Sequence, residues 1–250
     1  MKRISKALWE RLHGRRKVPF LIYNCKVNRD AEHVARFVAQ VMRTYGLKVA
    51  LLQEAVGYQS ALNALPGFTN YQSSRFPESS NVAILVRDGK LAQSLAFVKH
   101  FKSRWWGAKN NRWRNPRSTI AVRAYGILWI CLHRLAYQEA KGGVNLKGNR
   151  EIDDWIIEEY KDYTGRVLIG GDINDVETSE EVQRIKRKTA MMSDSLGGID
   201  FVIYKGALDV DMISKLEETG GSDHHPKIGV ATRRRRTLIS RRRKNRTKAA

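Results

Sequence analysis

Short apolar runs alternate with polar turns along most of the chain, and each run has the length of a β-strand. Several of them contain almost no polar residue, which is typical of strands that are buried on both faces. The predicted strands are residues 20–24 (FLIYN), 49–53 (VALLQ), 82–86 (VAILV), 119–122, 127–132 (ILWICL), 167–170 and 199–204 (IDFVIY).

Helical periodicity is found in fewer places. Residues 31–45 and 151–160 carry apolar side chains at helical spacing on one face. Residues 1–17 show the same spacing at Ile4, Ala7, Leu8 and Leu12, which indicates a short amphipathic helix. Strands outnumber helices, so we expect two packed sheets flanked by helices rather than a doubly wound sheet.

Basic residues divide the chain into a body and two arms. The 250 residues suffice for one core, and we expect a basic N-terminal arm (1–17), a central domain (18–231) and a basic C-terminal tail (232–250). The net charge of +21 falls to +11 without residues 231–250. Such a charge suits a polyanion, with nucleic acid the first candidate and an anionic membrane the second. The tail is expected to be solvated and disordered when unbound, which is compatible with tethering to nucleic acid or with a localisation signal.

The two cysteines, Cys25 and Cys131, lie inside apolar runs and are expected to be free thiols. Residues 1–17 lack the apolar core of a secretory signal, and the longest apolar run, 127–132, is too short to span a bilayer. We therefore expect a soluble monomer of the cytoplasm, nucleoid or nucleus, without stable membrane insertion.

Polar residues follow the predicted strands at the points where a sheet can present them to a common cleft. Each has an ordinary structural explanation. Asn24 and Glu54 suit turns or helix caps, and His133 suits a partly buried imidazole with a satisfied hydrogen bond. Asp172 and Asn174 could form an Asx-turn before a helix at 176–188, and Asp223 could belong to a loop that closes the last strand.

The order of these residues is more informative than any one of them. YNCKVN surrounds Asn24, LLQE ends at Glu54, and SNVAILVR, CLHR, GGDIN, GIDFVIY and GSDHHP follow in turn. In this order the motifs resemble the endonuclease/exonuclease/phosphatase superfamily, which includes pancreatic deoxyribonuclease, AP endonucleases, sphingomyelinases and inositol polyphosphate 5-phosphatases. The resemblance covers about residues 20 to 230 and implies a deoxyribonuclease-I-like α/β (α+β) fold, a four-layer sandwich of two mixed β-sheets flanked by helices.

The resemblance also implies roles for the residues that match the motifs. Glu54, Asn24 and Asp223 would hold Mg²⁺ or Mn²⁺. Asp172 would orient or deprotonate the attacking water, and Asn174 would donate to a phosphate oxygen. His224, held by Asp200, would bond or protonate the phosphate, and His133 would lie near the leaving group.

The substrate class must be judged from outside this shared set of residues. Residues 101–123 contain no acid and interleave basic and aromatic residues, which favours phosphate neutralisation and base stacking. The predicted nucleic-acid-binding residues are Arg104, Trp105, Trp106, Lys109, Arg112, Trp113, Arg114 and Arg117. Alternatively, some of these tryptophans belong to the core, or the segment inserts at a lipid headgroup layer.

Together these observations predict a divalent-metal-dependent endonuclease of low sequence specificity acting on DNA, with RNA as the other possible substrate. CLHR stands where AP endonucleases carry a Tyr-x-Pro-Asn block, which argues against abasic-site specificity. A phosphoinositide or sphingomyelin hydrolase at anionic membranes and a catalytically silent nucleic-acid-binding module are the alternatives. The chain lacks a P-loop, a GxGxxG turn, HExxH and any CxxC pair.

Overall fold

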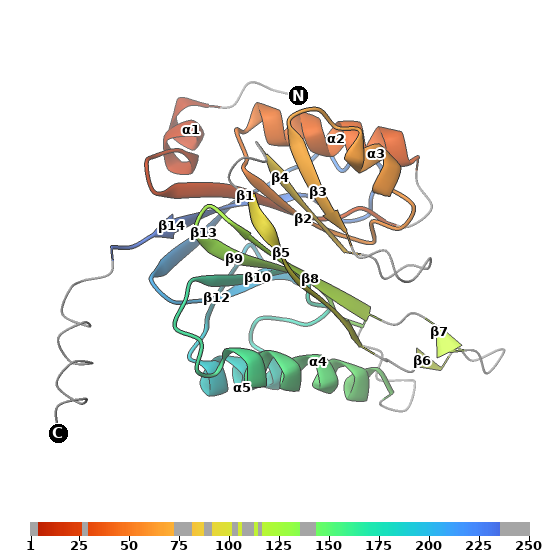
Figure 1. The fold of residues 1–250 in the computed structure, drawn as a ribbon, viewed down its shortest axis with the longest axis vertical. Helices are drawn as coiled ribbons and strands as arrows, with labels where there is room; N and C mark the ends of the chain where they lie inside the picture. The colour runs from red at the N-terminus through yellow and green to blue at the C-terminus, as the bar shows by residue number, and fades with distance from the viewer. Residues whose placement is uncertain are drawn as a thin grey trace.

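Two six-stranded β-sheets pack face to face, and helices cover the outer face of each (Figure 1). The computed structural model of the protein describes residues 5–26, 30–72, 82–87, 92–101, 105–106, 113–114, 117–135 and 144–235. The first sheet has the order β13 (Leu208–Lys215), β14 (Lys227–Arg233), β1 (Lys17–Asn24), β2 (Val49–Gln53), β4 (Ala83–Arg87) and β3 (Phe68–Gln72). The second has the order β11 (Met192–Ser195), β12 (Asp200–Lys205), β10 (Val167–Asp172), β9 (Ile127–His133), β8 (Arg117–Ala124) and β5 (Ala92–Phe101).

Each sheet contains one parallel pair among antiparallel neighbours. β1 runs parallel to β2, and β9 runs parallel to β10. The carboxyl ends of both pairs lie at the same end of the sandwich, because Asn24 at the end of β1 contacts Asp172 at the end of β10, and His133 at the end of β9 lies near Glu54, which follows β2. This arrangement brings together the polar residues that follow these four strands.

The helices form the two outer layers. α1 (Lys6–Leu12), α2 (Ala31–Thr44) and α3 (Gln59–Asn63) cover the first sheet, and α4 (Val144–Tyr160) and α5 (Glu180–Thr189) cover the second (Figure 1). Asp30 and Ser179 cap α2 and α5 by accepting backbone N–H groups of the first turn. The predicted helix at 176–188 was therefore wrong at its start, because the Ser179 cap sets the first turn at Glu180.

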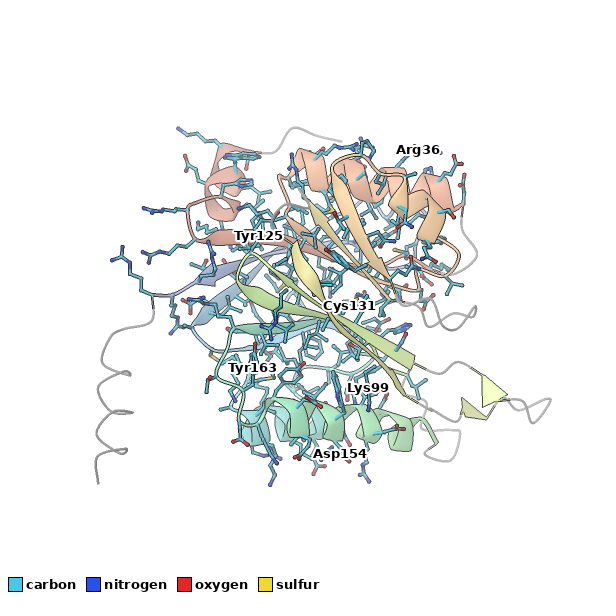
Figure 2. All side chains as sticks on the ribbon, viewed as in Figure 1. Arg36, Lys99, Tyr125, Cys131, Asp154 and Tyr163 are labelled. Carbon is cyan, nitrogen blue, oxygen red and sulfur yellow. The ribbon has the colours of Figure 1, made fainter. Side chains whose placement is uncertain are left out.

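A central core fills the space between the sheets, with Phe20, Leu51, Trp129 and Leu168 among its members. Cys131 lies at the centre of the molecule between the sheets (Figure 2). Its thiol donates to the backbone oxygen of Leu52 at 3.2 Å and so joins β9 to β2.

Two consecutive glycines allow the sheets to approach closely beneath the site. A Cβ at Gly170 would lie 2.8 Å from Cδ1 of Leu51 on the opposite sheet. Gly171 has φ +149°, and a Cβ there would overlap the backbone oxygen of Leu132. The Gly-Gly pair therefore fixes the distance between β10 and its neighbours just before Asp172.

The predicted fold class is confirmed, and so are the helix at the N-terminus and the free, buried state of both cysteines. Sequence reasoning missed α3 and the strands β3, β5, β11, β13 and β14, as well as the two-residue strands β6 (Trp105–Trp106) and β7 (Trp113–Arg114). Most of the C-terminal tail, residues 236–250, lies outside the described residues. Among the helices that the structure describes, none combines the length and apolar character that crossing a membrane requires.

Candidate active site

The amide of Asn24 links two carboxylates that arrive from different sheets. Asn24 ends β1, and its Nδ2 donates to Oε1 of Glu54 at 3.2 Å and to Oδ2 of Asp172 at 3.0 Å. The backbone N–H of Lys26 donates to Oδ1 of Asn24, which fixes the orientation of the amide because a backbone N–H cannot accept. Both amide hydrogens are thus used to hold Glu54 and Asp172 together.

Backbone strain is concentrated at this end of the sandwich. Lys26, Glu54 and Asn174 have φ values of 58°, 53° and 51°, in the left-handed region that non-glycine residues rarely occupy. Asparagine tolerates this region better than most residues because its short polar side chain can form local hydrogen bonds. Glutamate does not share this property, so the conformation is more unusual at Glu54 than at Asn174. Strain of this kind persists where the surrounding structure imposes it, and it is frequent at functional sites.

His133 is buried beside both carboxylates. It ends β9, next to Asp172 in the parallel pairing of β9 with β10. Its Nε2 lies 3.6 Å from Oδ2 of Asp172 and 3.8 Å from Oε1 of Glu54. The imidazole is only 2% exposed, so its interactions are made mainly within the protein.

The GGDIN motif forms a tight Asx-turn at the end of β10. Oδ1 of Asp172 accepts the backbone N–H of Asn174 at 3.0 Å. Nδ2 of Asn174 donates to the backbone oxygen of Arg134 at 2.8 Å, which leaves a second amide hydrogen for another acceptor. The turn expected from the sequence is therefore present, and it also orients two of the predicted catalytic side chains.

His224 and Asp200 form a carboxylate–imidazole pair on the other side of Asp172. Nδ1 of His224 lies 3.2 Å from both carboxylate oxygens of Asp200, and its Nε2 points toward Oδ2 of Asp172 at 3.8 Å. The loop that carries His224 is fixed by Ser222, whose hydroxyl donates to the backbone oxygen of Asn24 and accepts the N–H of His224.

The surroundings raise the pKa values of two of these groups. Burial raises the pKa of Asp172 to about 6, and the negative charge of Asp200 adds to the effect. The hydrogen bond with Asp200 raises the pKa of His224 to about 9, against the opposing effect of burial. At neutral pH, Asp172 is therefore mostly ionised and His224 mostly protonated.

Two sets of residues in this region have atoms that suit a metal ion. The first is Asp172, Asp200 and His224, whose ligand atoms lie within 4.8 Å of one another. Asp200, however, already faces the His224 imidazole and the Lys227 ammonium group, which is 3.7 Å away, so a cation there would meet two positive groups. The second set, Glu54 with Asp172, offers carboxylate oxygens, which are the ligands that Mg²⁺ prefers. We therefore favour Glu54 and Asp172 as the residues that fit a divalent ion.

The structure brings together most of the predicted site residues. Asn24, Glu54, His133, Asp172, Asn174, Asp200 and His224 share one continuous cluster. Asp223, predicted as a further metal ligand, is directed to a different partner. Its side chain is 63% exposed and pairs with Nζ of Lys26 at 2.8 Å, and this contact lowers its pKa.

The predicted nucleic-acid-binding segment is described only in part. Arg104, Lys109 and Arg112 lie outside the described residues. Trp105 and Trp106 in β6 pair with Arg114 and Trp113 in β7, and Arg117 begins β8, but only the backbone of these residues is described. Their contact with nucleic acid stays a prediction.

Two buried basic residues that support the site were missed by sequence reasoning. Arg134 follows His133, and its guanidinium lies between Asp153 of α4 at 3.2 Å and Asp175 at 3.4 Å. Lys227 begins β14, and its Nζ donates to the backbone oxygens of Gly197 and Asp200 at 2.7 Å and 2.6 Å. Their burial left little signal in the sequence, because basic residues are usually exposed. Arg134 is the last residue of CLHR, and Lys227 directly follows GSDHHP.

Comparison with known proteins agrees with this arrangement. The sequence profile of the Endonuclease/Exonuclease/phosphatase family matches residues 21–224, while no curated protein sequence matches the chain. A solved endonuclease/exonuclease/phosphatase from Bacteroides vulgatus is 14% identical and has a TM-score of 0.65, with 87% of this chain and 99% of that chain covered.

Two further structures are similar at the same level. The human nocturnin catalytic domain with a bound sulfate anion is 13% identical, with a TM-score of 0.61 and coverage of 88% of this chain and 95% of that chain. A mannosyl-6-phosphatase from Bacteroides thetaiotaomicron is 15% identical, with a TM-score of 0.60 and coverage of 86% and 99%. These likenesses concern the fold. With the profile match over most of its length, the chain belongs to the endonuclease/exonuclease/phosphatase family, whose members are hydrolases that act on phosphoester bonds.

Proposed function

We propose that this protein is a divalent-metal-dependent endonuclease that hydrolyses phosphodiester bonds of DNA with low sequence specificity. The observation that carries the proposal is the juxtaposition of Asp172 and His224, whose Oδ2 and Nε2 atoms lie 3.8 Å apart. A carboxylate base and an imidazolium donor at this separation can act on the same side of one phosphate group, the carboxylate on the attacking water and the imidazolium on a phosphate oxygen.

In this proposal Asp172 accepts the proton of the attacking water. Its pKa of about 6 keeps it ionised at neutral pH while leaving it more basic than an exposed carboxyl. Asn24 holds the carboxylate through Nδ2, and the Asx-turn to Asn174 holds its other oxygen, so the base is oriented before the substrate arrives. Such orientation lowers the entropic cost of reaching the transition state.

His224 and Asn174 bind the phosphate group. The imidazolium of His224 donates from Nε2, while Asp200 holds Nδ1 and stabilises the positive charge. Asn174 donates its second amide hydrogen to a phosphate oxygen. Donors already fixed in place stabilise the negative charge that spreads over these oxygens in the transition state. His133, buried behind Glu54, is proposed to act near the leaving group.

Glu54 and Asp172, with Asn24 positioning both, are the residues proposed to hold Mg²⁺ or Mn²⁺. When bound, the ion supplies positive charge against the phosphate oxygens. Asn24 donates its two amide hydrogens to the two carboxylates, so its proposed role is to position these ligands. Asp223, which pairs with Lys26, is proposed as an additional ligand only because of its place in the GSDHHP motif.

We propose nucleic acid as the substrate because the protein carries a large net positive charge. A net charge of +21 and the acid-free segment 101–123 favour a long polyanion over a small ester. A second candidate, a phosphomonoesterase acting on a sugar phosphate, is favoured only by the similar fold of the Bacteroides thetaiotaomicron mannosyl-6-phosphatase. A lipid phosphoesterase and a silent binding module are the remaining alternatives.

The test is nicking of supercoiled plasmid DNA by the purified protein with Mg²⁺ or Mn²⁺. Nicking should disappear with EDTA and in Asp172→Asn, and it should persist in Asp162→Asn, the same change at an exposed position outside the site. Parallel reactions contain RNA, a sugar phosphate, and vesicles of phosphoinositide or sphingomyelin. Release of phosphate or headgroup without cleavage of either nucleic acid would refute the nuclease assignment.

A further inference from the structure

A second strongly basic surface lies at the end of the sandwich opposite the active site. We call it the basic edge. It comprises Arg15, Arg16, Lys17, Lys48, Arg166, Arg233, Arg234 and Arg235. These residues come from four distant parts of the chain, so the fold rather than local sequence assembles them.

Direct contacts join several members of the basic edge. β1 and β14 pair through Lys17 and Thr232, and the backbone N–H of Arg233 donates to the oxygen of Arg16 at 3.1 Å. Nη2 of Arg166 donates to the backbone oxygen of Arg234 at 2.9 Å, and Nζ of Lys48 lies over the ring of Tyr125. Figure 2 shows Tyr125 on the side of the molecule where α1 lies and β14 ends.

The positive charge of this surface is little compensated. Among the residues that the structure describes, one acidic side chain forms an ion pair with the basic edge. It is Asp209, which pairs with Arg234. Burial lowers the pKa of Lys48, and the nearby charge of Arg233 lowers it further. Arg15, Arg16 and Arg235 are exposed, and within the described part of the chain their side chains form no hydrogen bond or ion pair.

Distance separates the basic edge from the catalytic residues. β1 has eight residues and runs from Lys17 in the basic edge to Asn24 in the active site. At about 3.3 Å per residue, the two ends lie roughly 23 Å apart. The two surfaces face opposite ends of the sandwich, so a straight segment of polymer in the active site cannot also contact the basic edge.

Exposed apolar groups that could enter a lipid layer are few here. Leu8 and Leu12 of α1 face the core beneath the helix, so the helix has no free apolar face. Trp9 is the one large exposed apolar residue on α1, and its ring stacks on His13 at 3.7 Å. Arginine-rich, polar surfaces of this kind suit the spaced phosphates of a nucleic acid better than a bilayer.

We infer that the basic edge is a second nucleic-acid-binding surface, which holds a segment of the polymer distant from the bond being cut. Exposed Arg15, Arg16 and Arg235 contact backbone phosphates, and the half-buried members strengthen the local positive potential. This inference extends the proposed nuclease function, but binding at the basic edge does not depend on catalysis. It implies that long or folded nucleic acids bind more tightly than short ones, because they can reach both surfaces.

The experiment compares two triple variants with the same loss of charge. In the first, Arg15, Arg16 and Arg235 are changed to alanine. In the control, Lys186, Arg187 and Lys188 in the last turn of α5 are changed to alanine. Binding to a fluorescent DNA duplex is measured in EDTA over a range of salt concentrations, so no cleavage occurs and failure of the nuclease proposal cannot affect the result.

Loss of three phosphate contacts should weaken binding and reduce the slope of log K against log salt by up to about 2.7 in the first variant only. Both variants should retain the wild-type circular dichroism spectrum and melting temperature. Equal changes in the two variants would overturn the inference, because they would reflect net charge alone. Unchanged DNA binding with weakened binding to phosphatidylserine vesicles would also overturn it and would identify a membrane surface.

Discussion

Replacing Asp200 by asparagine should remove most of the upward shift in the pKa of His224. The substitution keeps the shape of the side chain and removes its charge. The hydrogen bond from Nδ1 of His224 to Asp200, at 3.2 Å, is the largest cause of the raised pKa of about 9, while burial acts in the opposite direction. We expect the pKa of His224 to fall toward its ordinary value of 6.5.

The expected change follows from these two values. A fall of about 2.5 pH units corresponds to about 3 kcal/mol of differential stabilisation between the two protonation states. Because the pKa of His224 is higher in the folded protein than in the unfolded chain, this stability is fully present below pH 6.5 and is lost as pH rises through 9. The wild-type protein should lose it across that window, and Asp200→Asn should lose much less.

The direct assay is an NMR titration of the histidine ring protons, with His224 assigned by comparison with His224→Gln. Asp223→Asn is the matched control, because Asp223 is the weakest of the three carboxylates that raise the pKa. A His224 pKa that stays near 9 in Asp200→Asn, or that falls equally in the control, would falsify the assigned cause. The activity of the wild-type enzyme should rise through about pH 6, as Asp172 ionises, and fall through about pH 9.

Three further outcomes are expected. Arg134→Met should lower the free energy of unfolding in urea by about 3–5 kcal/mol, because it leaves the buried carboxylate of Asp153 unpaired, and a second change, Asp153→Leu, should recover part of the loss. Gly170→Ala should cost about 1–3 kcal/mol by the same measurement and reduce activity, because its Cβ would press on Leu51 of the opposite sheet. Mg²⁺ at a hundredfold excess over its Kd should stabilise the protein by about 2.7 kcal/mol, and Glu54→Gln should abolish this gain in a thermal unfolding assay with an EDTA control.

The parts of the site that follow strongly apolar strands could be predicted from sequence. Asn24, Glu54, His133 and Asp172 each stand at the end of a strand whose apolar run is unmistakable, and parallel pairing brings such ends together. Recognition of the motifs added Asn174, Asp200 and His224. Their hydrogen bonds depend on loop geometry, which periodicity does not describe.

Other features depend on long-range packing and left little local signal. β13 alternates buried and exposed residues but contains Asp209 and Asp211, which weakened its apolar pattern. β14 begins with the buried Lys227, whose ammonium group is satisfied by backbone oxygens from a distant loop. Arg134 is 1% exposed only because Asp153 and Asp175 meet it in the folded protein. Local patterns cannot reveal such partners, because they lie many residues away.

The position of β14 has a consequence for how the protein folds during its synthesis. β14 lies between β13 and β1, so the last strand in the described part of the chain joins β13 to the rest of the first sheet. Before residues 227–233 leave the ribosome, β1 has an open edge and the loop bearing His224 has no strand to anchor it. A nascent chain therefore carries most of the proposed catalytic groups without being able to assemble them. Folding must wait for this distant pairing, and enzymatic competence should appear in one late step rather than grow with chain length.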